Sequence, residues 1–215
     1  MKIKALILLG IIILSCKNED VIDKSKVLPF YNSEAFTPEW ISESDENYSK
    51  VHKIAPFKFT NQNGEKVTNK TFAGKIYIAD FFFTTCPSIC PILAKNMGAI
   101  QETYKDDDEI LLLSHTVMPL VDTVDKIKEY ATEKKAINGK WHLITGERDK
   151  IYDLARTSYF ADEDFVKTKD KSEFIHTENF ILIDKLGRIR GVYNGTLAVD
   201  VKRLQRHIEI LKQEI

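Results

Sequence analysis

Apolar residues recur along the chain in short runs and in helical periods, and the two patterns alternate. The longest internal run, residues 75–83, is nearly continuous, as expected of a strand that is buried on both faces of a sheet. Residues 91–104 place four apolar side chains near one helical face, with proline in the first turn, where it is tolerated. Similar patterns predict strands at 110–114 and 141–144, and helices at 124–136, 150–157 and 200–212.

Two hairpins flank this alternating order. Residues 57–60 and 65–68 alternate apolar and polar positions around Asn61-Gln62-Asn63-Gly64, a turn with Asn-Gly chemistry. Residues 180–184 and 189–193 lie on either side of a second turn and precede the last helix. Parallel strands followed by a hairpin predict an α/β, thioredoxin-like fold with an N-terminal β-hairpin and a late β-hairpin before the C-terminal helix.

The start of the chain has a different pattern. A basic stretch, Met1-Lys2-Ile3-Lys4, precedes an apolar run at 5–14 and then Ser15-Cys16, which is typical of an export signal. The run is shorter than the roughly 20 apolar residues that a bilayer-spanning helix needs, so cleavage is expected. Because Ile13-Leu14-Ser15-Cys16 resembles a bacterial lipoprotein box, residues 1–15 are predicted to be a signal peptide and Cys16 to carry lipid. An uncleaved anchor or an ordinary signal peptide are alternatives that would also export the protein.

The segment after Cys16 is polar and acidic and has no sustained apolar period. Residues 16–50 are therefore predicted to be a lipidated N-terminus and spacer, ahead of a folded domain at 51–215. Aromatic residues at 29–31 and 36–40 interrupt this spacer, and they are expected to dock on the domain or on a partner. The polar stretch 161–173 is predicted to be a surface loop.

Composition and charge exclude one class of function. The 215 residues are 43% hydrophobic, which is enough for one core. The 31 basic and 32 acidic residues nearly balance, so no basic field is available to bind nucleic acid. With Cys16 assigned to lipid, two of the three cysteines remain, in a compartment where thiols can be oxidised or bind metal.

These two, Cys86 and Cys90, are four residues apart where a predicted strand gives way to a helix. Positions four apart share a helical face, so both sulfur atoms can reach one ion or each other. The helix N-terminus favours thiolate, the form that binds metal and attacks disulfides. Soft thiolates select copper(I) or zinc, and an added imidazole would suit copper in either oxidation state. A structural disulfide or two buried thiols are the alternatives, but a proline after each cysteine favours a working pair.

The segment Asp80-Phe81-Phe82-Phe83-Thr84-Thr85-Cys86-Pro87-Ser88-Ile89-Cys90-Pro91 resembles the signature of SCO/SenC proteins, which are copper chaperones for cytochrome c oxidase assembly. The resemblance extends over about 54–211. It implies a thioredoxin fold facing outward from the cytoplasmic membrane. It also implies that Cys86, Cys90 and His176 bind Cu(I) or Cu(II), for delivery to the binuclear copper site of the oxidase or with reduction of the cysteines of that site.

Two positions depart from the family pattern. Ile175 stands where an acidic residue commonly precedes the histidine, and without that carboxylate the His176 ring would be less well oriented. His115 stands where aspartate is common, at the end of a predicted strand, and is a reserve ligand or proton donor. The other three histidines receive no role: His142 is expected in the sheet, His207 on the polar side of the last helix, and His52 at the domain junction.

Two functions use the same cysteines. A metallochaperone would hold copper with Cys86, Cys90 and His176 and pass it to the copper-bearing subunit of cytochrome c oxidase or to another envelope cuproprotein. A thiol–disulfide oxidoreductase would use the cysteines as a redox-active pair and would not need the imidazole. A peroxidase ranks third, because the motif contains no arginine. In each case the protein is expected in a bacterial cell envelope, held at a membrane by its lipid, with its domain outside the cytoplasm.

Overall fold

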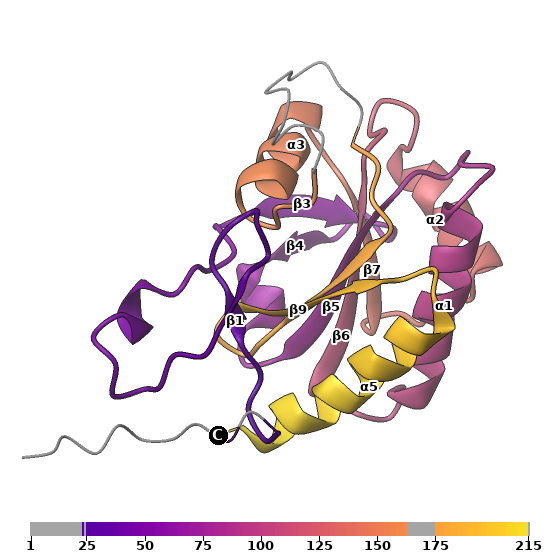
Figure 1. The fold of residues 1–215 in the computed structure, drawn as a ribbon. Coiled ribbons are helices and arrows are strands. Elements are labelled where there is room, and N and C mark those ends of the chain that lie inside the picture. The colour runs from indigo at the N-terminus through magenta and orange to yellow at the C-terminus, as the bar shows by residue number, and fades with distance from the viewer. Residues whose placement is uncertain (1–22, 24, 163–174, 215) are drawn as a thin grey trace, which may run out of the picture.

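The computed structural model describes residues 23, 25–162 and 175–214, and Figure 1 shows a central sheet with helices on both faces. The predicted signal peptide, Cys16 and nearly all of the loop predicted at 161–173 lie outside these residues. In the described parts no helix is both long and apolar enough to cross a membrane.

The sheet has seven strands in the order β4-β3-β7-β6-β5-β8-β9. The central strands β5, β6 and β7 are parallel, whereas β3 pairs antiparallel with β7, and β8 with β5. Both predicted hairpins are confirmed, as β3–β4 and β8–β9. The strands are β3 (Lys58–Asn61), β4 (Lys66–Thr68), β5 (Ile76–Phe82), β6 (Ile110–Thr116), β7 (Trp141–Thr145), β8 (Asn179–Ile183) and β9 (Ile189–Asn194).

The helices divide between the two faces of the sheet. They are α1 (Cys90–Thr103), α2 (Val124–Glu133), α3 (Arg148–Thr157) and α5 (Ala198–Gln213), with short 3-10 turns η1 (Tyr48–Lys50) and η2 (Asn69–Phe72). Figure 1 shows α1, α2 and α5 on one side and α3 on the other. Because side chains alternate along β5, Ile76 and Ile78 join the core under α1 and α5, while Tyr77 and Ala79 join the core under α3. The α/β, thioredoxin-like prediction is confirmed.

Two of the element ends that differ from the prediction have a clear structural cause. Helix α2 ends at Glu133 rather than at 136, because Lys135 adopts a left-handed backbone with φ of 56°, which terminates the helix. Strand β6 continues to Thr116 rather than to 114, because its last residues still pair with β5 and remain fully buried. His115 therefore lies inside a strand and not after it.

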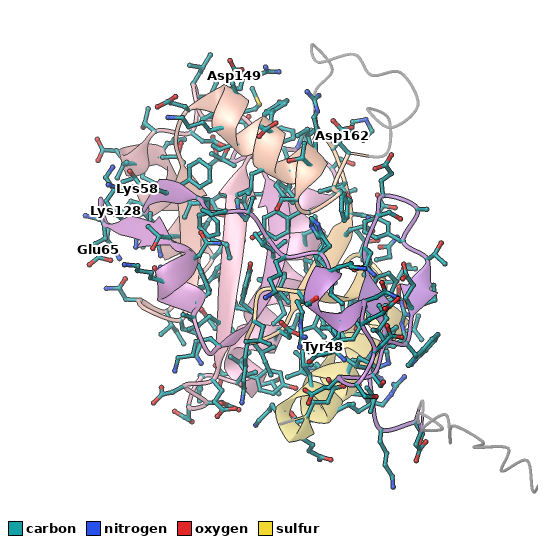
Figure 2. All side chains as sticks on the ribbon, turned by 90° about the vertical axis from the view of Figure 1, so that its left-hand side faces the viewer. Tyr48, Lys58, Glu65, Lys128, Asp149 and Asp162 are labelled. Atoms are coloured by element: carbon teal, nitrogen blue, oxygen red, sulfur yellow. The ribbon has the colours of Figure 1, made fainter. Side chains whose placement is uncertain are left out.

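Part of the predicted spacer packs on the domain. Leu28 and Phe30 are buried, and the two-residue strands β1 (Phe30–Tyr31) and β2 (Pro38–Glu39) pair as a small separate ribbon. The Arg190 guanidinium on β9 donates to the carbonyl oxygen of Leu28 at 2.6 Å. Figure 2, where Tyr48 is labelled, shows this segment next to α5. The aromatic Phe30 thus docks on the domain, one of the two possibilities that the sequence left open.

Candidate metal and thiol site

The two cysteines lie where β5 leads into α1, as the sequence predicts. Strand β5 ends at Phe82, a loop follows, and α1 begins at Cys90 with Pro91 in its first turn. Both thiols are free; Cys86 is half-buried and Cys90 is buried. The structure therefore presents one accessible thiol and one covered thiol at the start of a helix.

A cavity of about 400 Å³ opens beside the thiols. It brings together all three predicted ligands, Cys86, Cys90 and His176, and its remaining wall is mostly apolar. The other lining residues are Phe81, Phe82, Phe83, Pro87, Ser88, Ile89, Val117, Ile175, Thr177 and Glu178. An apolar wall keeps water away from part of the site, which strengthens the electrostatic interactions inside it.

His176 lies on the wall of the same cavity as the two thiols. Its side chain is exposed, just before β8, whereas its neighbours Ile175 and Thr177 are buried. Ile175, the position where the family commonly has an acid, packs into the apolar core under α3. Among the described residues, no three His, Cys, Asp or Glu side chains stand together as a metal-binding group. A complete copper ligand set thus stays a prediction, and it would require the His176 side chain and the two thiols to come closer together.

The pKa values of the two thiols shift in opposite directions. Burial disfavours the Cys86 thiolate, but hydrogen bonds from the Cys90 thiol and from the backbone N–H groups of Cys90, Ser88 and Ile89 outweigh it and lower the pKa of Cys86. Burial raises the pKa of Cys90, and its hydrogen bond with Cys86 raises it further. The helix start therefore favours thiolate at Cys86 and thiol at Cys90.

Asp80 lies close to the cysteine pair, although the sequence did not predict it as a site residue. It is the one acidic residue in the apolar run of β5, is 2% exposed, and faces the same core as Cys90. Its Oδ1 atom has no hydrogen-bond partner. Burial raises the pKa of Asp80 to about 7, and its charge contributes to the raised pKa of Cys90. A single acid in a strand buried on both faces was the available signal.

Replacing Asp80 with Asn should stabilise the metal-free protein at neutral pH. A folded-state pKa near 7, against 3.8 unfolded, means that wild-type stability falls as pH rises between those values. Asparagine does not ionise, so the stability of Asp80→Asn does not fall in this way. Its free energy of unfolding should exceed that of wild type by on the order of 2 to 4 kcal/mol at pH 8 and should be close to it below pH 4. Urea unfolding across pH 3.5–8 measures it, with the exposed Asp125→Asn as control. If the difference in unfolding free energy between Asp80→Asn and wild type were the same at every pH, ionisation of Asp80 would not be its cause.

A second missed acid, Asp122, fixes the entry to the cysteine loop. Its carboxylate is fully buried and accepts from the Thr84 hydroxyl at 2.5 Å, from the Thr84 backbone N–H and from the Thr116 hydroxyl. Such charge-assisted bonds are among the stronger ones in proteins. They tie the loop after β6 to the loop after β5, so the cysteine segment starts from a fixed point.

The structure corrects two expectations about histidines. His115 is fully buried, stacks on Phe81 at 4.9 Å and faces the core under α3, across the sheet from Cys90. Burial lowers its pKa to about 3, so it is neutral, and it cannot serve as a reserve ligand from that face. His207 does not lie on a polar side but is half-buried, 2.8 Å from the Tyr193 hydroxyl.

The remaining histidines are structural, in agreement with the sequence analysis. His142 is buried within β7 beside Asn61. His52 lies away from the cysteines, with its ring Nε2 2.8 Å from the carbonyl oxygen of Ser158. Neither contributes to the cavity.

Comparison with known proteins gives consistent matches. The family model described as SCO1/SenC matches residues 45–211. A SCO1 protein homolog of Bacillus subtilis is 29% identical over 146 residues, which are 67% of this chain and 75% of that protein. A SCO1/SenC family lipoprotein from Bacillus anthracis superposes with a TM-score of 0.66 at 26% identity, covering 76% of this chain and 96% of the other. Bradyrhizobium japonicum ScoI, solved with copper bound, has a TM-score of 0.54 at 27% identity, covering 71% and 99%.

Proposed function

Because the chain belongs to the SCO1/SenC family, we propose that it is a metallochaperone that carries copper to the binuclear copper site of a cytochrome c oxidase. The observation that carries this proposal is the shared cavity of Cys86, Cys90 and His176, two free thiols and an exposed imidazole. The copper-bound structure of a relative with this fold supports it.

The acidities suggest an order of binding. The Cys86 thiolate takes Cu(I) first, because it is accessible and its pKa is lowered. Bound metal then draws the proton from the Cys90 thiol, since a coordinated thiol is deprotonated. His176 completes a three-coordinate site when its side chain and the sulfur atoms come closer together. Such a site leaves the copper open to an incoming ligand, which lets a partner remove it by exchange.

Replacing His176 with Ala should weaken copper binding without abolishing it. The domain retains two thiolates, so one Cu(I) per chain should still bind, with an affinity lowered by roughly 10- to 100-fold. Anaerobic titration of the reduced domain against a Cu(I) chelator measures this affinity. The absorption spectrum of the Cu(II) form should change more than Cu(I) affinity does, because Cu(II) prefers nitrogen ligands more strongly than Cu(I). The matched control is His52→Ala, away from the cavity. No copper bound by wild type would refute the chaperone proposal.

A second function is favoured by the asymmetry of the pair. The accessible Cys86 thiolate would attack a client disulfide, forming a mixed disulfide and releasing one client thiolate. Cys90, buried beside it, would then attack Cys86, forming the Cys86–Cys90 disulfide and releasing the second client thiolate. The client is reduced and the pair is oxidised by two electrons. This activity needs no imidazole and would persist in His176→Ala.

The cellular setting belongs to the same proposal. The lipoprotein box at Cys16 supports a lipid anchor in a bacterial envelope, with the domain outside the cytoplasm, where copper-bearing oxidase domains would be reached. Mass spectrometry of the membrane-extracted protein should find acyl groups on Cys16 and no residues 1–15, and an N-terminal peptide that still carries residues 1–15 would argue for an uncleaved anchor.

A further inference from the structure

Large exposed apolar side chains lie at the end of the sheet that holds the cysteine site. Seven are exposed among the residues that the structure describes, and five of them lie on three segments: the start of α1 after β5, the loop after β6, and the segment from the end of β9 to the first turn of α5. These five are Ile92, Leu120, Val121, Leu197 and Val199, of which Leu120 is 87% exposed. Strands β5, β6 and β9 run in the same direction, so all three segments leave the same edge of the sheet.

Hydrogen bonds join the three segments to one another and to the cavity. Asp122, at the end of the loop after β6, holds Thr84 in the cysteine loop. The Asn96 side chain on α1 donates to the carbonyl oxygen of Gly195, before α5, at 2.7 Å. The Gly195 N–H in turn donates to the backbone carbonyl oxygen of Glu178, a residue that lines the cavity. The three segments that carry the apolar side chains therefore lie next to one another at the end of the sheet that holds the cysteines.

The three segments themselves carry no charged side chain, although the exposed Glu178 lines the cavity beside them. Residues 84–94, 116–121 and 195–199 contain no Asp, Glu, Lys or Arg, in a chain that is 29% charged. Surfaces exposed only to water normally carry many charged side chains. Uncharged surface segments that expose leucine and valine are typical of a site that a partner covers.

We propose that these three segments, called here the apolar rim, are the docking surface for the copper-bearing domain of the oxidase, which must present an uncharged surface around its own metal ligands. This inference rests on the proposed function. Transfer by exchange requires donor and acceptor ligands to hold the ion together, so the acceptor must cover the rim. A charged group placed against Leu120 would lose its hydration without a counter-ion, which selects an uncharged partner surface.

The test uses a variant of the rim and a matched control. The variant is Leu120→Glu with Leu197→Glu. The control is Leu186→Glu, because Leu186 is 57% exposed in the β8–β9 turn, at the opposite edge of the sheet. Calorimetry measures association of each copper-free, reduced protein with the soluble copper-bearing domain of the oxidase subunit from the same organism. The rim variant should raise the Kd at least about tenfold and the control less than about twofold. The wild-type Kd should change less than about threefold between 50 and 500 mM NaCl.

Copper retention against a chelator, measured on the same three proteins, separates this inference from the proposed function. Equal retention shows that the rim variant left the metal site intact. A wild type that associates through the rim but retains no copper would refute the chaperone and leave the docking surface standing. Equal association of the rim variant and wild type would overturn the inference. So would association lost in high salt, or wild-type binding to phosphatidylcholine vesicles in place of the oxidase domain.

Discussion

Replacing Cys86 and Cys90 together with serine should abolish copper binding. Serine hydroxyls are hard, neutral donors near pH 7, whereas Cu(I) requires soft thiolates, so the affinity should fall by at least about a thousandfold. The imidazole of His176 alone cannot hold the ion in a site open to solvent. Anaerobic chelator competition on the reduced domain measures the loss. Ser88→Ala, an exposed position between the cysteines, is the control and should retain one copper per chain.

The single variants separate the two candidate functions. Cys90→Ser keeps the nucleophilic Cys86 but removes the resolving thiol, so it should accumulate a mixed disulfide with an oxidised peptide client. Cys86→Ser should form far less, because the remaining thiol is buried and has a raised pKa. Mass spectrometry of quenched mixtures measures the adduct. Equal trapping by both variants would contradict the assigned nucleophile, and no trapping by either would leave copper binding as the function of the pair.

The succession of strands and helices along the chain and the position of the cysteine pair were readable from the sequence because both depend on local patterns. Continuous apolar runs mark buried parallel strands, and Asn63-Gly64 marks a turn whose glycine adopts φ of 78°. The cysteine spacing at a strand-to-helix junction likewise needs only neighbouring residues. These features were confirmed without knowledge of any distant contact.

The features that the sequence did not reveal depend on partners far along the chain. Asp122 accepts a hydrogen bond from Thr84, 38 positions earlier in the chain, and no local sequence pattern near either residue predicts this contact. In the sequence, Asp80 only interrupts an apolar strand. Its proximity to the cysteines follows from the packing of α1 on β5. His115 seemed to end its strand because Thr116 and Val117 were not expected to continue the pairing toward Phe82. Which face of the sheet a side chain occupies follows from register, and register follows from tertiary pairing.

Arg190 is a further example, and it supports the second large prediction. Its side chain is only 2% exposed, yet it pairs with Glu214 at 2.6 Å and with Asp184 at 3.5 Å. It also donates to the carbonyl oxygens of Leu28 and Pro29, 161 or more positions away. One side chain on β9 therefore joins the N-terminal segment, the late hairpin and the end of α5.

Replacing Arg190 with Ala should be the most destabilising single change outside the cysteine site, costing about 3 to 5 kcal/mol of unfolding free energy. The change removes the ion-pair partner of Glu214, whereas Asp184 keeps Arg188, and the carbonyl oxygens of Leu28 and Pro29 also lose their donor. Arg190→Lys should recover little, because an ammonium group cannot reach several acceptors in the planar arrangement of a guanidinium. Urea denaturation at pH 7 measures all of these values.

The matched control is Arg203→Ala on α5. Arg203 pairs with Asp200 at 3.2 Å, but its side chain is 41% exposed, so its loss should cost less than about 1 kcal/mol. Because the Arg190 network is shielded from solvent, the gap between the two variants should persist in 0.5 M NaCl. Copper affinity should stay unchanged at temperatures where Arg190→Ala is folded, since the network lies at the end of the sheet opposite the cysteines. If Arg190→Ala lowered the free energy of unfolding no more than Arg203→Ala does, the N-terminal segment would be held by its apolar contacts alone.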